Sequence, residues 1–157
     1  MQICTFKAQT TNTVQNLWQL WTNVKNWSNW DGELQEVQLT GPFKQGCTGT
    51  LVYRDGTHKT FTVIKLQVLE SMVISIPYAR GTELLIKRDM RQEGPEVHFE
   101  QDVTLSGTFI TKMMMGSHKE PLRQVAGQQM QRMLELLEGR RAFAPDGALV
   151  GATKTAH

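Results

Sequence analysis

Two polar side chains, Arg88 and Gln101, interrupt apolar rows and offer the clearest chemistry in this sequence. The two rows, each with a spacing of two residues, are Leu84, Ile86, Arg88, Met90 and Phe99, Gln101, Val103, Leu105. Because alternate side chains of a strand share a face, each row would lie on one face of its strand. If both faces point into an apolar pocket, Arg88 would recognise a carboxylate or carbonyl, and Gln101 a hydroxyl. In the other register Arg88 lies in solvent beside Lys87 and Arg91.

Three further polar residues each admit two interpretations. Tyr53 shares strand parity with Leu51, and it either adds a phenol to the same pocket or is an ordinary half-buried strand residue. Asp31 follows a short aromatic turn and precedes Gly32, which favours a turn-capping role over a catalytic carboxylate. Gln129 is either another polar point of the pocket or part of the surface. We assign no residue to catalysis.

The sequence has no motif for a metal ion, a nucleotide or a redox reaction. It contains no nucleophile elbow, no glycine loop that cradles phosphate and no CxxC pair. Its histidines are scattered, and none has a second ligand at a metal-binding spacing: His58, His98, His118 and His157. We therefore expect no metal site and no cofactor.

Length and charge limit the class of partner and the setting. The chain has 157 residues, a formal net charge of +2 and no basic run longer than Arg140–Arg141, which argues against nucleic acid as a partner. No apolar run reaches membrane-spanning length, and residues 1–4 form no leader. Cys4 and Cys47 do not make a disulfide framework, so a reduced, cytoplasmic setting is expected. We expect one domain over residues 1–139 and a C-terminal tail over 140–157.

Hydrophobic periodicity divides the chain into seven strands and three helical segments. The predicted strands are 2–8, 34–39, 48–54, 58–69, 72–77, 82–92 and 97–106. A helix with an apolar stripe from Val14 to Val24 is followed by a single helical turn around Trp27 and Trp30. The longest helix spans 117–138, with Ser117 and Glu120 as a capping box and Gly139 as a left-handed stop. The apolar parity shifts within 58–69, which predicts a bulge.

The order of these elements predicts an α+β fold. Short connections make consecutive strands antiparallel, and a sheet of this width must curl. We therefore expect a seven-stranded curved antiparallel sheet wrapped around the long C-terminal helix, with two short helices after the first strand. Trp27 and Trp30 are expected mainly to anchor their turn on the sheet, and alternatively to form a lip of the pocket.

Several segments carry a resemblance to a known family: 17–24, 27–31, 37–39, 41–43 with Gly46 and Gly49, and 103–107. On these residues the chain, nearly to Gly139, resembles the START-like or SRPBCC superfamily with its helix-grip fold. The most similar branch is that of the polyketide cyclase/dehydrase-like proteins. The resemblance implies a cavity between the sheet and the last helix that takes sterols, lipids, polyketides or other hydrophobic molecules. In the family the position of Gln101 is commonly histidine, so glutamine there speaks against proton transfer.

We accordingly predict that the protein binds a hydrophobic small molecule, as a monomer or a homodimer. The inward-facing residues expected to contact the ligand are Tyr53, Phe61, Val63, Ile74, Ile86, Arg88, Phe99, Gln101, Val103, Met115, Leu122, Ala126, Met130 and Met133. Large side chains among them are also able to fill the cavity. One alternative is a polyketide cyclase or dehydratase-type enzyme without metal or redox cofactor. Another is a protein-binding module, as in chaperone-activating or ribosome-associated members, which an exposed apolar patch at Met113–Met115 would favour.

Overall fold

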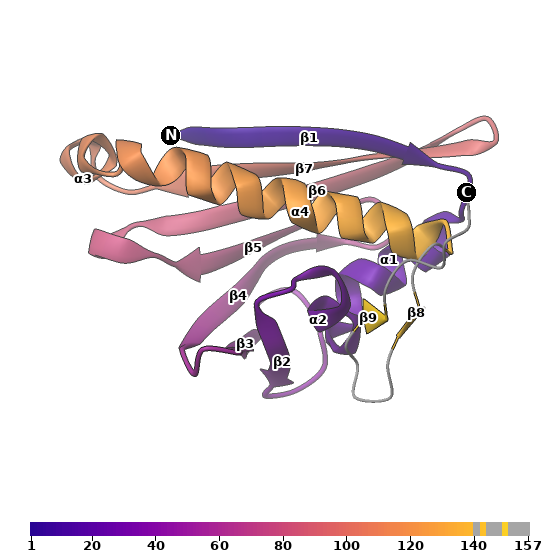
Figure 1. Cartoon of the computed structure of the whole chain (residues 1–157), viewed down its shortest axis with the longest axis horizontal. Coiled ribbons are helices and arrows are strands. Elements are labelled where there is room, and N and C mark those ends of the chain that lie inside the picture. The colour runs from indigo at the N-terminus through magenta and orange to yellow at the C-terminus, as the bar shows by residue number, and fades with distance from the viewer. Residues whose placement is uncertain (140–141, 144–148, 151–157) are drawn as a thin grey trace.

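The computed structural model describes residues 1–139, 142–143 and 149–150 (Figure 1). The strands of the large sheet are β1 (Gln2–Thr10), β2 (Leu34–Leu39), β3 (Thr48–Tyr53), β4 (His58–Gln67), β5 (Ser71–Pro77), β6 (Glu83–Glu93) and β7 (Glu96–Ser106). The helices are α1 (Val14–Thr22), α2 (Trp27–Trp30), α3 (Phe109–Met114) and α4 (Lys119–Leu137). Single 3₁₀ turns are η1 (Val24–Asn26), η2 (Ala79–Gly81) and η3 (Gly116–His118).

The seven strands form one antiparallel sheet in the order β1-β7-β6-β5-β4-β3-β2. Strands β2 to β7 follow one another as a meander, and β1 closes the edge beside β7. The long helix α4 crosses the sheet and packs mainly against β1 and α2 (Figure 1). The predicted α+β helix-grip architecture is therefore confirmed, including the two short helices after the first strand.

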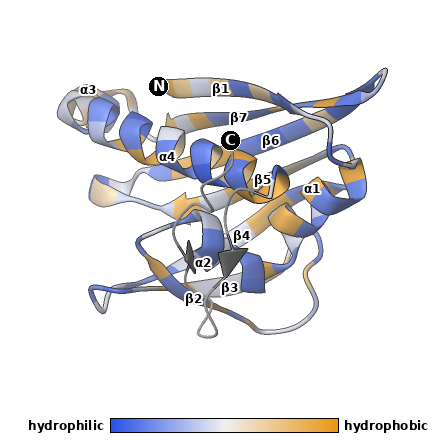
Figure 2. Cartoon of the chain, turned by 45° about the vertical axis from the view of Figure 1, so that its right-hand side comes forward, coloured by the Kyte–Doolittle hydropathy of each residue, from blue (hydrophilic) through white to orange (hydrophobic). Residues whose placement is uncertain are grey.

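Alternation of side chains determines which face of the sheet meets α4. Figure 2 shows hydrophobic and hydrophilic residues alternating along the strands. In β7 the alternation is strict, and every second residue from Val97 to Leu105 is buried. The predicted bulge in β4 is also confirmed, because the pairing with β5 shifts register between Val63 and Lys65. As a result Val63 is buried, whereas Ile64 is 50% exposed.

The two ends of the long helix differ in how well the sequence predicted them. Gly139 has φ +71°, so the predicted left-handed stop is confirmed. The predicted capping box is wrong, since α4 begins after His118, which makes no side-chain cap hydrogen bond. Ser117 lies inside η3, one position before the N-cap His118, so it is not the residue that caps α4.

A short helix, α3, forms where the sequence predicted only a connector. The Thr108 side chain caps it by accepting a hydrogen bond from the backbone N–H of Thr111 at 3.2 Å. Met115, directly after α3, is fully buried. The apolar residues of the helix itself face solvent, so the usual signal of an apolar stripe turned to the core is absent.

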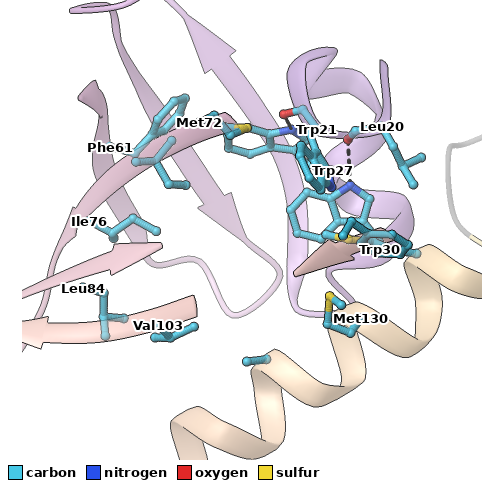
Figure 3. Close-up of a cluster of buried hydrophobic side chains, with 14 of the residues drawn as sticks. Leu20, Trp21, Trp27, Trp30, Phe61, Met72, Ile76, Leu84, Val103 and Met130 are labelled. Atoms are coloured by element: carbon cyan, nitrogen blue, oxygen red, sulfur yellow. Dashed lines mark hydrogen bonds between the residues drawn. The ribbon is translucent and has the colours of Figure 1, made fainter. Parts of the chain in front are cut away.

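Three buried tryptophans, which we call the tryptophan cluster, join the short helices to the sheet: Trp21, Trp27 and Trp30 (Figure 3). The indole N–H of Trp27 donates to the carbonyl of Trp21, and that of Trp30 to the carbonyl of Leu20, each at 3.0 Å. The ring of Trp27 lies 5.1 Å from that of Phe61, centroid to centroid. Both indoles are buried and hydrogen-bonded, as packing anchors should be.

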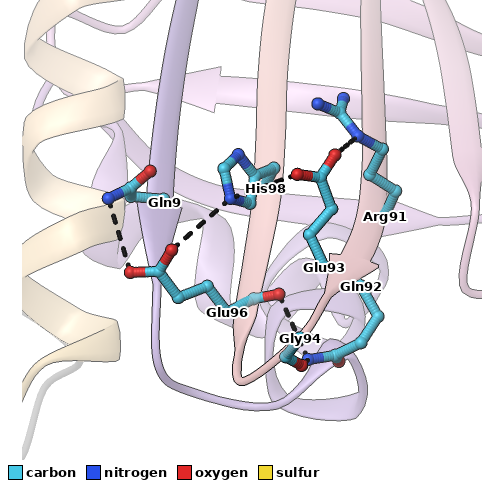
Figure 4. Close-up of polar contacts among 7 residues, drawn as sticks. All are labelled: Gln9, Arg91, Gln92, Glu93, Gly94, Glu96 and His98. Carbon is cyan, nitrogen blue, oxygen red and sulfur yellow. Dashed lines mark hydrogen bonds and ion pairs between the residues drawn. The ribbon is translucent and has the colours of Figure 1, made fainter.

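The β6–β7 hairpin is held by polar contacts on its exposed end (Figure 4). Arg91 forms an ion pair with Glu93, and Nε2 of His98 lies 3.7 Å from Glu93 and 3.6 Å from Glu96. Gly94 takes φ +58° at the turn. These contacts lie at the turn end of the hairpin, whose backbone register also pairs the central residues of β6 and β7.

The part of the chain that the structure describes contains no helix long and apolar enough to cross a membrane. Within the same residues no three His, Cys, Asp or Glu side chains are grouped as a metal site would need. Of the predicted tail over 140–157, Ala142–Phe143 (β8) and Leu149–Val150 (β9) pair with each other. The rest of the tail lies outside the described residues.

Candidate ligand-binding site

A cavity of about 630 Å³ lies between α4 and the inner face of the sheet. Its walls come from α2 and the following turn, from β3 to β7, and from the first half of α4. The exposed members of the wall, such as Arg54, Asp55 and Pro121, mark its open side. The size is within the range typical of small-molecule sites.

Half of the predicted contact residues lie on this wall. They are Tyr53, Ile74, Ile86, Arg88, Val103, Leu122 and Ala126. The others are buried in the core but do not line the cavity: Phe61, Val63, Phe99, Gln101, Met115, Met130 and Met133. The tryptophans account for part of this division, because Trp21 packs against Phe99 and Trp27 against Phe61. Met130 lies across from Ile76 and Leu84 on the strands (Figure 3).

Arg88 and Gln101 are direct partners across β6 and β7, and both are only 1% exposed. The prediction that both face inward is therefore confirmed, and the solvent-facing register is excluded. Nε of Arg88 donates to Oε1 of Gln101 at 2.7 Å, and Nε2 of Gln101 donates to Oε1 of Gln129 at 3.3 Å. Nε2 of Gln129 donates to Oδ2 of Asp31, also at 3.3 Å. A chain of hydrogen bonds thus connects the guanidinium to a carboxylate on the opposite side of the site.

The Arg88 guanidinium is buried, and no carboxylate of the described residues forms an ion pair with it. Its central carbon lies 4.7 Å from the ring centroid of Trp30. Its Nη1 is buried and has no hydrogen-bond partner among the described residues. Burial lowers the pKa of Arg88 to about 9, and the charge of Asp31 acts in the opposite direction. A cation held this way is stabilised by any anion or carbonyl oxygen that enters the site.

Asp31 has the turn-capping role that the sequence favoured, and it also reaches the cavity. One carboxylate oxygen accepts the backbone N–H of Glu33 at 3.1 Å, so the predicted turn cap is confirmed. Asp31 also lines the cavity. Burial raises the pKa of its carboxyl, while the hydrogen bond from Glu33 and the charges of Arg132 and Arg88 lower it. A carboxyl whose pKa is raised is a candidate proton donor or acceptor.

Lys59 and Tyr78, which the sequence did not predict, form another part of the wall together with the predicted Tyr53. Nζ of Lys59 lies 5.7 Å from the ring centroid of Tyr53 and 5.3 Å from that of Tyr78. The Tyr78 hydroxyl lies 2.9 Å from Nδ1 of His118. Burial raises the pKa of both phenols, so both stay protonated at neutral pH. No sequence signal could have found Lys59 and Tyr78, because each takes part through a long side chain next to a turn.

Comparison with protein-family models and with curated protein sequences found no match. Solved structures, by contrast, match in fold. DynU16, a protein of the dynemicin biosynthetic locus, superposes with a TM-score of 0.68 at 14% identity over 85% of this chain. That match spans 46% of the DynU16 chain, so this chain corresponds to about half of it.

Two smaller proteins match over most of their length. Truncated norcoclaurine synthase from Thalictrum flavum gives a TM-score of 0.64 at 9% identity, over 85% of this chain and 91% of the synthase. CalU16 from Micromonospora echinospora gives 0.52 at 12% identity, over 86% and 85% of the two chains. At these identities the likeness concerns fold. The chain thus has the helix-grip fold that its resemblance to the START-like superfamily implies.

Proposed function

We propose that this protein binds a hydrophobic small molecule, such as a lipid, sterol or polyketide, in the cavity between the sheet and α4. The observation that carries the proposal is the buried Arg88 guanidinium on an otherwise largely apolar wall. A cavity of about 630 Å³ has room for roughly twenty waters, and so for a ligand with roughly twenty non-hydrogen atoms. The ligand carries a carboxylate or carbonyl oxygen for Arg88 and an apolar body for Ile74, Ile86 and Val103.

The named neighbours support a ligand of biosynthetic origin. DynU16 is described as a protein of a biosynthetic locus, and norcoclaurine synthase is named as an enzyme. Both share only the fold with this chain, so the chemistry of the ligand rests on the residues of the cavity. The proposal includes a single domain over 1–139. It also includes a reducing, cytoplasmic setting, which the free thiols of Cys4 and Cys47 favour.

The test begins with mass spectrometry of the purified full chain, native and after solvent extraction, to find a co-purified molecule. Thermal unfolding is then followed with fatty acids and polyketide acids, and with the methyl esters and alcohols of the same skeletons. We expect acids to stabilise the wild type most and to lose this advantage in Arg88→Met. Lys87→Met, on the outward-facing neighbour, is the matched control. An empty protein whose melting temperature no compound of the panel shifts would contradict the proposal.

A second candidate, an enzyme of the cyclase or dehydratase kind, is favoured by Asp31. The inward strand faces carry no carboxylate, but Asp31 brings one to the wall, at the end of the hydrogen-bond chain from Arg88. In such an enzyme Asp31 would move a proton, and Arg88 would stabilise the developing enolate. Asp31→Asn should then abolish turnover of a poly-β-carbonyl substrate while leaving binding intact. Equal turnover by wild type and variant would rule out this role.

A further inference from the structure

We infer that α3 docks this protein onto an anionic lipid surface. Four large apolar side chains of this six-residue helix are exposed, and we call them the apolar tip: Phe109 at 74%, Ile110 at 70%, Met113 at 68% and Met114 at 55%. Helix residues four positions apart are neighbours, so the tip forms one continuous face. An exposed apolar face of this kind marks an interaction site.

The apolar tip stands at one end of the molecule on a fixed base. Figure 1 shows α3 at the end near the N-terminus, beyond the first turn of α4 and away from α1 and α2. Met115, immediately after the helix, is fully buried, and the Thr108 cap closes the other side. Among the described residues nothing covers the tip, since its four side chains keep 55% or more of their surface.

The segment that carries the apolar tip has a positive charge. From Thr108 to Lys119 the sequence has Lys112 and Lys119 but no carboxylate, and Glu120 is the first acid to follow. The N-terminal ammonium also lies at this end. Burial lowers its pKa most, and the nearby charge of Lys112 lowers it further. Apolar side chains inside a basic surround are the pattern of segments that bind the interface of anionic bilayers.

The size of the tip favours a lipid surface over a second protein. A large side chain presents about 150–250 Å², so four partly exposed ones amount to on the order of 500 Å². A stable protein interface needs about 800 Å² from each partner. The tip is also convex and carried by a single short helix, which suits insertion between lipid headgroups. A second copy of this chain or a protein partner becomes an outcome of the test.

The position of the tip would bring the cavity close to the membrane. Three residues after Met115, His118 contacts Tyr78, which lines the cavity, and Pro121 of the next turn lies on the open side. Docking through α3 would therefore hold that side near the source of an apolar ligand. The inference goes beyond ligand binding and does not depend on it, because vesicle binding is measurable on the protein without ligand.

The experiment is vesicle flotation of the full chain with phosphatidylcholine alone and with about 20% phosphatidylglycerol added. The wild type should bind the anionic vesicles, and about 0.5 M NaCl should release most of it. Phe109→Gln/Met113→Gln and Lys112→Glu/Lys119→Glu should each lower the vesicle partition coefficient about tenfold or more. The matched control is Val68→Gln in the turn between β4 and β5, where Val68 is as exposed as Met113, both at 68%. This control should bind like the wild type.

Three results would overturn the inference. The wild type fails to bind anionic vesicles in preference to neutral ones, or Phe109→Gln/Met113→Gln binds as well as the wild type. The third is a wild-type dimer in sedimentation that this variant converts to a monomer, which would make the tip an interface between copies. Arg88→Met separates the two proposals, because it should lose the ligand and still float with anionic vesicles.

Discussion

Replacing Arg88 with methionine should stabilise the ligand-free protein. Burial lowers the pKa of this guanidinium from 12.5 to about 9. At about 1.4 kcal/mol for each pKa unit, the charged form is penalised by roughly 5 kcal/mol in the folded state. For a base whose folded pKa is lowered, this penalty is fully present below the folded pKa and disappears as the pH rises towards the unfolded value. At neutral pH the whole penalty therefore acts.

Two favourable contacts of Arg88 offset part of that penalty. Its hydrogen bond to Gln101 would be lost, which leaves a buried amide oxygen unsatisfied at a cost of about 1–3 kcal/mol. Its stacking on Trp30 is worth about 2 kcal/mol in a buried site. Methionine keeps an unbranched apolar stem in the same space. The expected net effect of Arg88→Met is a gain of up to about 2 kcal/mol in the free energy of unfolding.

Urea unfolding of the protein freed of ligand measures this gain. The midpoint should rise for Arg88→Met without a change in the slope with urea, and the melting temperature should rise by up to roughly 8 °C. Lys87→Met, with a side chain 51% exposed, should stay within about 0.5 kcal/mol of the wild type. A loss of more than about 1 kcal/mol in Arg88→Met would refute the reasoning. It would mean that Arg88 is a satisfied structural residue and not a cation in need of a ligand.

Other substitutions test the neighbouring parts of the site and the sheet. Asp31→Asn should raise the free energy of unfolding at neutral pH, because burial raises the pKa of this carboxyl and penalises its charged form. The difference from wild type should shrink as the pH falls and vanish below the unfolded value of 3.8, as unfolding measured over a pH series would reveal. Gly49→Ala should cost about 1–3 kcal/mol, because a Cβ there would lie 2.5 Å from the Phe61 ring and 2.8 Å from a backbone oxygen. Gly41→Ala, with nothing within 4 Å, should leave the urea midpoint unchanged, and equal midpoints for both variants would contradict this packing argument. Trp30→Phe should lower the free energy of unfolding by about 1–3 kcal/mol, because it leaves the Leu20 carbonyl without its donor. A variant as stable as the wild type in urea denaturation would contradict this.

Local patterns predicted the sheet well because strands and turns leave short-range signals. Strand β2 begins and ends at Leu34 and Leu39 as expected, between turn residues on both sides. The inward direction of Arg88 followed from the apolar residues that share its row. The register that would place Arg88 in solvent remained an alternative, because the facing of a whole strand depends on its pairing with neighbouring strands.

The parts of the site that the sequence missed depend on contacts between distant segments. Asp31 and Gln129 are 98 positions apart, and no periodic pattern relates them. The seven predicted contact residues that do not line the cavity face inward as expected. Two of them, Phe61 and Phe99, pack against Trp27 and Trp21, whose packing volume a pattern of polar and apolar letters does not contain. The helix α3 was missed because its apolar side chains point to solvent.

The place of β1 beside β7 has a consequence for how the chain folds. The N-terminal ammonium donates to the carbonyl of Leu105, 104 residues later, so the sheet edge joins the two ends of the described domain. Ribosomes add about 5–20 residues per second. Roughly 5–20 s therefore pass between the synthesis of β1 and that of its partner β7. The meander from β2 to β7 closes through shorter loops and is able to form first. Docking of β1 is then the late step, and until it occurs the hydrogen-bonding edge of β7 stays open to pairing with other strands.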